Sequence, residues 1–428
     1  MTVTTVTVLQ KNRYKGTASS SMSGLNKNYF QRAIDRGNGA LLPLEWSDWS
    51  DFYQPVALAG TELIGCGFGA NFVLRIPDHW NGMLVSAATP ATRDAYSLDI
   101  YFADSIQSQG FAFLASDKGT PGRELEGDPF AAAKNALLER RAMECWHDSF
   151  AGLTAWAQHF LAQDGRDIDL NAGVEFSVTG TENFGIKTFA VGLSNGGYVV
   201  RRALERDSNM AHLFAGGLEV EGVCWLPEVN LISTLRDFIL EYTALRAAKT
   251  DNEKSHHRAR LLALGLPDCP EPLWRFYHEY YWFIVFNIYR DYFDRDFASP
   301  LPWQQYLELA SNGLRKKDHD LDLVQYHWAD RLAQIELPKR LINSGNLEAP
   351  LISIYGSWDC LCVPRYHLSA YADCVNKQGK ADLHRIYEVE RATHIDSLVH
   401  SLWDSGKELQ PMLPEAQARF KELVSWIN

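Results

Sequence analysis

The chain has 428 residues, of which 46% are hydrophobic, so it can bury a sizeable core as one large domain or as two. Lysine and arginine total 41 against 53 aspartates and glutamates, and the resulting net charge of −12 argues against a nucleic-acid partner, which would require a basic surface. A charged fraction of 22% and an aromatic fraction of 12% also exclude a disordered or fibrous chain.

The N-terminal stretch lacks a basic start followed by an apolar segment, so we expect no secretory signal. No run approaches the ~20 apolar residues of a membrane span, and we expect no membrane partner. The seven cysteines are odd in number and scattered, which favours reduced thiols in a cytoplasmic protein. Cys360 and Cys362 form a C-x-C with no second pair of matching spacing, so we expect no metal site. We expect no other cofactor.

Residues 1–59 are polar at first and then contain an aromatic cluster around Trp46 and Trp49, which predicts an arm packed on the core. From about residue 60, short apolar runs alternate with helical stretches, a pattern typical of a sheet covered by helices on both faces. The first two runs flank a turn at 78–81 and are expected to be neighbouring strands. The predicted strands are 71–76, 82–87, 111–116, 186–192, 214–221, 350–356 and 383–389, with helices at 97–109 and about 127–163.

Strand signals stop between residues 227 and 345, where the sequence predicts only helices and loops. Near-continuous apolar runs such as 351–355 are typical of parallel strands buried on both faces. The chain is therefore predicted to form an α/β fold, a doubly wound, mostly parallel sheet built from 60–226 and 346–428, with a helical cap, 227–345, inserted between them. The helices expected in the cap are 231–248, 273–293, 303–314 and 321–336.

Immediately after the apolar run 186–191 the chain reads Gly192-Leu193-Ser194-Asn195-Gly196-Gly197, followed by a segment of helical spacing. This is G-x-S-x-G between a strand and a helix, the context of a nucleophile elbow. The glycines are expected where neighbouring backbones come too close for a Cβ, and Ser194 is expected in a strained conformation. The alternative is a tight strand–helix turn in which Ser194 only caps the helix.

A serine hydroxyl needs a base and an orienting acid to act as a nucleophile at neutral pH. Asp359 follows one predicted strand, and His394 follows the next. Both loops should open at the same carboxyl edge of the sheet as Ser194. Glu221, which follows the strand before the cap, is the main alternative acid.

These features resemble the α/β-hydrolase family over residues 70–226 and 346–428. The resemblance rests on the elbow, on the Gly-x-x-Asp-x-x-x-Val stretch that begins at Gly356, and on the corner at His394. The segment 75–82, Arg-Ile-Pro-Asp-His-Trp-Asn-Gly, is similar to a lead-in of esterases related to the tannase, feruloyl esterase and hydroxybutyrate-oligomer hydrolase group. The resemblance implies a serine esterase with the α/β-hydrolase fold.

The resemblance also implies a role for each residue of the constellation. Ser194 would attack a carbonyl carbon, His394 would take and return the proton, and Asp359 would hold the imidazole tautomer. Together these roles imply a catalytic triad that acts on a carboxylic ester through an acyl-enzyme intermediate.

A tetrahedral intermediate needs donors for its oxyanion. The resemblance implies the backbone N–H of Asn195 and a second N–H from the loop after strand 82–87. Many relatives have His-Gly at that corner, whereas this chain has Ala-Ala-Thr followed by Pro90, which has no N–H. We expect Thr89 to be the second donor, with Ala88 as the alternative.

The helix predicted at 273–293 carries aromatic residues on several faces, which indicates burial nearly all round. In the family that the sequence resembles, an insertion at this point of the chain lies over the active site. One face of the helix, including Tyr277, Tyr281 and Trp282, is therefore expected to line a pocket for a bulky apolar or aromatic substrate. The alternative is that these side chains only form the core of the cap.

The function expected from these observations is hydrolysis of a small-molecule ester. An acyltransferase or cyclase would use the same triad with an acceptor other than water, and a dry cap would favour it. A non-catalytic binding protein on a hydrolase scaffold is supported only by the Ala-Ala-Thr substitution. The sequence leaves open the identity of the substrate and whether the chain forms a homodimer.

Overall fold

The structure is a computed structural model of the whole chain. The predicted helix 303–314 and the aromatic cluster around Trp46 and Trp49 lie outside the described residues. Among the residues described, no helix combines the length and the apolar character needed to cross a bilayer. The described residues are 3–16, 56–91, 95–119, 142–163, 175–179, 184–206, 210–294, 296–297, 326–335, 339–401 and 403–428.

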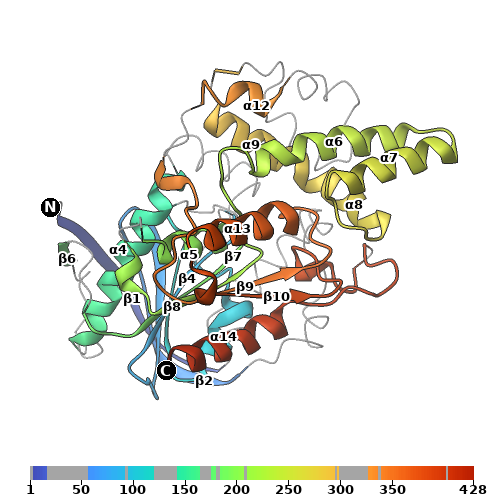
Figure 1. Cartoon of the computed structure of the whole chain (residues 1–428). Helices are drawn as coiled ribbons and strands as arrows, with labels where there is room; N and C mark the ends of the chain where they lie inside the picture. The colour runs from blue at the N-terminus through green and yellow to red at the C-terminus, as the bar shows by residue number, and fades with distance from the viewer. Residues whose placement is uncertain are drawn as a thin grey trace.

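A ten-stranded sheet forms the centre of the molecule, in the order β10-β9-β8-β7-β4-β5-β3-β2-β1-β6 (Figure 1). The six strands from β10 to β5 pair in parallel, and the remaining pairs are antiparallel. The strands are β1 Val3–Gly16, β2 Leu58–Gly67, β3 Ala70–Pro77, β4 Leu84–Ala88, β5 Ala112–Ser116, β6 Glu175–Thr179, β7 Thr188–Leu193, β8 Gly216–Val220, β9 Leu351–Gly356 and β10 His384–Val389.

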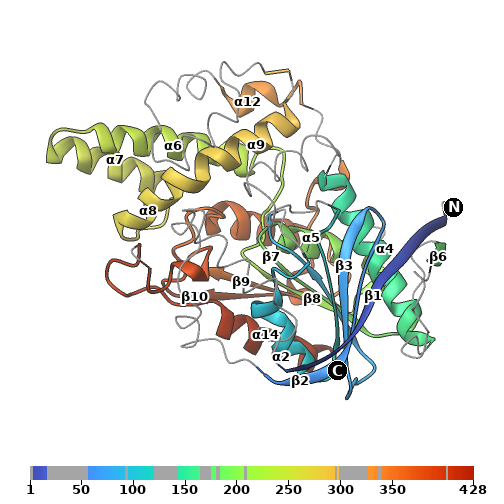
Figure 2. The ribbon, with the colours of Figure 1, turned by 180° about the vertical axis from the view of Figure 1, so that it is seen from behind.

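Helices cover both faces of the parallel part of the sheet (Figures 1 and 2). Along β7, Phe189 and Val191 pack into the cluster that contains α14, whereas Ala190 between them packs into the cluster that contains α5. This alternation buries both faces, so the doubly wound, mostly parallel sheet of the α/β-hydrolase fold is confirmed. The helices on the sheet are α2 Asp104–Gln107, α4 Ala142–Ala162, α5 Asn195–Leu204, α13 Ala370–Lys377 and α14 Leu413–Ile427.

Two details of the sheet differ from the sequence-based expectation. The segment predicted to be an arm contains β1, a full strand that pairs with β2 on one side and β6 on the other, and β2 itself begins before residue 60. The expectation that β3 and β4 are neighbours is wrong, because β5 lies between them and pairs with both. A short turn limits how far apart two strand ends lie, but it does not prevent a third, fully buried strand from entering between them.

A second group of helices lies together beyond the sheet, on the side of α5 and α13 (Figures 1 and 2). The helix predicted at 273–293 is one continuous run in which a π-turn, His278–Trp282, joins α8 to α9. Side-chain capping boxes begin α6 at Asn230 and α7 at Thr250. These helices are α6 Leu231–Ala247, α7 Asp251–Ala263, α8 Glu271–Tyr277, α9 Phe283–Phe293 and α12 Trp328–Arg331.

Substitution in the aromatic cluster under α14 tests this packing. The Phe420 ring centroid lies 5.5 Å from that of Phe111 and 6.0 Å from that of Phe189. Phe420→Ala should lower the free energy of unfolding by about 3–5 kcal/mol, because it leaves a cavity in a dry cluster. Leu9→Ala, on a side chain that is 61% exposed, should change it by less than about 0.5 kcal/mol. Denaturant unfolding measures both, and equal losses would contradict the packing described.

Candidate active site

Ser194 lies at a sharp turn between β7 and α5. Its backbone has φ 57° and ψ −118°, a conformation that non-glycine residues rarely adopt. A Cβ on Gly196 would lie 1.9 Å from the carbonyl oxygen of Ala88, and one on Gly192 would lie 2.4 Å from that of Gly196. The glycines are therefore required by contact between backbones, as the elbow interpretation expects. The turn leaves the Ser194 side chain half-buried.

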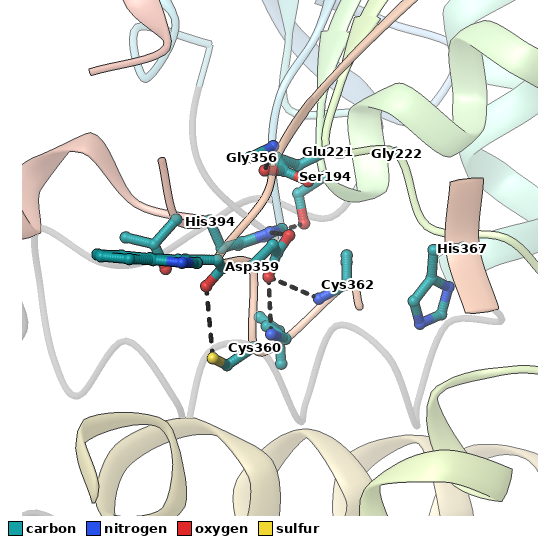
Figure 3. A network of polar contacts seen from close by, with 12 residues as sticks. Ser194, Glu221, Gly222, Gly356, Asp359, Cys360, Cys362, His367 and His394 are labelled. Atoms are coloured by element: carbon teal, nitrogen blue, oxygen red, sulfur yellow. Dashed lines mark hydrogen bonds and ion pairs between the residues drawn. The ribbon is translucent and has the colours of Figure 1, made fainter. Parts of the chain in front are cut away.

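His394 joins the other two residues of the predicted constellation (Figure 3). Its Nε2 atom lies 3.0 Å from Ser194 Oγ, and its Nδ1 atom lies 2.8 Å from Asp359 Oδ2. A neutral His394 that donates its Nδ1–H to Asp359 presents Nε2 as the acceptor for the serine hydroxyl. The structure thus brings together Ser194, His394 and Asp359 from the loops that follow β7, β10 and β9.

Asp359 is fully buried, yet its surroundings favour the ionised form. Burial by itself would raise its pKa, but the charge and hydrogen bond of His394, a hydrogen bond from Glu221 and backbone donors together hold the pKa below its ordinary value. Asp359 Oδ1 accepts from the backbone N–H of Leu361 at 2.7 Å and of Cys362 at 2.9 Å. A carboxylate that stays ionised here can stabilise a protonated His394.

Glu221, the alternative acid, lies beside Gly356 and does not replace Asp359 (Figure 3). It follows β8 with a φ of 51°, is buried, and accepts from the backbone N–H of Gly356 at 2.6 Å. Burial, and then the charge of Asp359, raise the pKa of Glu221 well above its ordinary value, which favours the protonated carboxyl as the hydrogen-bond donor to Asp359. Of the two acids, Asp359 is the one that contacts the imidazole.

A buried lysine fixes the loop that was expected to supply the second oxyanion donor. Lys118 Nζ donates to the carbonyl oxygen of Thr89 at 2.5 Å, to Thr89 Oγ1 at 2.9 Å and to the carbonyl oxygen of Ala91 at 3.3 Å. The same loop packs on the elbow at Gly196, so Thr89 and Asn195 lie on adjoining segments. Sequence reasoning missed Lys118, because nothing in its neighbours shows that its side chain turns inward.

The three aromatic residues expected to line the pocket have different environments. Tyr281 is half-buried, whereas Tyr277 and Trp282 have no exposed surface. The Tyr277 hydroxyl lies 2.7 Å from Thr393 Oγ1, and Trp282 Nε1 donates to the carbonyl oxygen of Cys360 at 2.7 Å. The two covered side chains therefore contact the His394 and Asp359 loops, and only Tyr281 has surface left for a substrate.

Within the described part of the chain, one group of histidine, cysteine and acidic side chains is close enough to share a metal ion. Asp359, Cys362 and His394 each offer a ligand atom within 4.8 Å of the others. Asp359 and His394 are already hydrogen-bonded to each other, and burial raises the pKa of the Cys362 thiol well above its ordinary value, which disfavours the thiolate that binds metals. The donor set fits a proton relay better than a metal site.

The sequence matches no family model and no curated protein. Among solved structures, the chain is similar to feruloyl esterase B from Aspergillus oryzae, with 10% identity, a TM-score of 0.48, and coverage of 91% of this chain and 80% of that one. A second esterase from Aspergillus oryzae gives 11% identity, a TM-score of 0.45 and the same coverage of 91% and 80%. An esterase from Pyrococcus furiosus gives 11% identity, a TM-score of 0.39, and coverage of 90% and 95%.

A pair of matched substitutions separates the two acids. Asp359→Asn should slow the reaction of Ser194 with a fluorophosphonate roughly 10³- to 10⁴-fold, because an amide no longer fixes the imidazole tautomer. Glu221→Gln should slow it by less than about 10-fold, because glutamine remains neutral and keeps one donor and one acceptor. Labelling rates followed by mass spectrometry measure both. If Asp359→Asn labels at the wild-type rate and Glu221→Gln does not label, the orienting acid is Glu221 instead.

Proposed function

We propose that the protein is a serine hydrolase that cleaves a carboxylic ester through an acyl-enzyme intermediate. The observation that carries the proposal is the unbroken hydrogen-bonded series from Ser194 through His394 to the buried Asp359. The nucleophile stands on a strained turn, and its side chain is half-buried, so a substrate can reach it. The base, His394, contacts both the nucleophile and the orienting acid before any substrate binds.

In the first half of the reaction, Ser194 Oγ attacks the carbonyl carbon of the ester while His394 Nε2 takes the hydroxyl proton. Asp359 keeps the Nδ1–H and stabilises the imidazolium that forms. The carbonyl oxygen becomes an oxyanion, to which the backbone N–H groups of Asn195 and Thr89 would donate. When the tetrahedral intermediate collapses, the ester C–O bond breaks, His394 gives its proton to the departing alkoxide, and the acyl group stays on Ser194.

The second half repeats these steps with water as the nucleophile. His394 Nε2 takes a proton from the water as its oxygen attacks the acyl carbon, and the same N–H groups receive the oxyanion. Collapse breaks the bond to Ser194 Oγ, and His394 returns the proton to that oxygen. The products are a carboxylic acid and an alcohol, and the enzyme is restored.

An aromatic surface next to the His394 loop supports a bulky apolar or aromatic substrate. Tyr281 is half-buried, and its ring centroid lies 5.5 Å from that of Phe276 and 5.8 Å from that of Tyr277. Trp403, also half-buried, lies 5.3 Å from Phe276. Rings of this kind offer a large apolar area and stacking faces to a substrate group.

Acyl transfer is the second candidate, and one observation favours it. The cap run places Tyr277 and Trp282, which have no exposed surface, directly against the loops of His394 and Asp359. Side chains that keep water away from these loops would help an alcohol or amine compete for the acyl group.

A cytoplasmic location is also part of the proposal, since all seven cysteines are free thiols, as is usual in a reducing compartment.

Labelling and turnover test the proposal directly. Wild type should react with a fluorophosphonate at Ser194 and hydrolyse short-chain nitrophenyl esters, and Ser194→Ala should lose at least about 10³-fold in turnover. Ser108→Ala, on an exposed serine at the end of α2, is the matched control and should keep full activity. Absence of labelling at Ser194 would refute both enzyme functions and favour a binding protein. Labelling with turnover only when an alcohol or amine is added would favour acyl transfer.

A further inference from the structure

One helical run contacts all three loops of the candidate active site. The run consists of α8, the π-turn and α9, and each contact is a hydrogen bond to a residue directly beside a member of the constellation. Tyr289 donates to Asn195 Oδ1 at 2.9 Å, and Asn195 follows Ser194. The other two bonds reach Thr393, which precedes His394, and Cys360, which follows Asp359; they come from Tyr277 and Trp282.

These contacts are shielded from water. Tyr277 and Trp282 are 0% exposed, and Tyr289 is 4% exposed. The Tyr289 ring packs 4.8 Å from Trp225, and the Trp282 ring packs 5.7 Å from Phe238, so the side chains have little room to rotate. Hydrogen bonds in such surroundings hold their partners more firmly than bonds that compete with solvent.

The π-turn helps to place the three side chains on one side of the run. Tyr277 and Trp282 are five residues apart, and at 100° per residue an α-helix would point them about 140° away from each other. The π-turn His278–Trp282 closes hydrogen bonds between residues five apart and so underwinds the helix at this point. Underwinding reduces the angle between the two side chains, which lets both reach the loops below.

We propose that Tyr277, Trp282 and Tyr289 are positioning residues, which hold the three loops of the active site at a fixed spacing from a single helix. The proposal rests on the hydrolase function proposed above and adds a role for the cap in turnover. The loops after β7, β9 and β10 are far apart in sequence, and a displacement of the order of 1 Å between catalytic groups can cost about 100-fold in rate. A shared helix restrains all three displacements together.

Because Tyr277 and Trp282 have no surface open to substrate, the role should show in kcat and not in KM. Tyr277→Phe and Tyr289→Phe each remove one hydroxyl and keep the ring. We expect kcat for a nitrophenyl ester, per titrated active site, to fall about 5- to 10-fold for each, with KM within about 2-fold of wild type. Tyr292→Phe is the matched control, because this tyrosine of α9 donates to Glu144 and not to an active-site loop, and its kcat should stay within about 2-fold.

A double-mutant cycle distinguishes positioning from general destabilisation. If the bond to Asn195 acts as proposed, adding Asn195→Ala to Tyr289→Phe should cost less than about 2-fold more, because the contact is already lost while the backbone N–H remains. If the losses in kcat of Asn195→Ala and Tyr289→Phe instead add in the double variant, the proposal is overturned. It is also overturned if kcat for Tyr277→Phe and Tyr289→Phe equals that of Tyr292→Phe. Wild type that fails to label with a fluorophosphonate would instead refute the hydrolase function, so the two failures are distinguishable.

Discussion

The hydrogen bond between His394 and the ionised, buried Asp359 is the interaction on which the rest of the site depends. A carboxylate without water is costly unless donors surround it, and here there are four: the imidazole, two backbone N–H groups of its own loop, and the carboxyl of Glu221. The parallel sheet makes this possible, because neighbouring parallel strands deliver their following loops to one edge. The strained turn at Ser194 is useful only because that hydrogen-bonded pair lies beside it.

Much of the site could be predicted from the sequence, because its signals are local. Ser194 stands in a strand–turn–helix motif, and Asp359 and His394 each follow an apolar run. The inward course of Lys118 could not be predicted, since it is set by the carbonyl groups of Thr89 and Ala91 on another loop. A mostly parallel sheet could be predicted, but the order of its strands could not. The apolar pattern identifies a strand without identifying its neighbours.

The aromatic run of α8, the π-turn and α9 shows a further limit of sequence interpretation. Tyrosine and tryptophan have an apolar body and one polar end, so spacing alone predicts a buried helix and is silent on what the polar ends contact. Tyr277 and Trp282 were expected to meet a substrate, yet their polar atoms meet the loops that hold His394 and Asp359. A choice between these roles needs the tertiary partner, which no periodicity records.

The position of β1 has a consequence for synthesis of the chain. β1 joins β6 to the rest of the sheet, and its partners β2 and β6 follow it in the sequence. During translation β1 emerges long before Glu175–Thr179, so the edge of β1 that pairs with β6 stays unpaired until then. Long-range pairing of this kind forms slowly. Until β6 arrives, the growing chain presents a strand edge to which other chains can attach. The antiparallel margin of the sheet is therefore one place where nascent copies can associate.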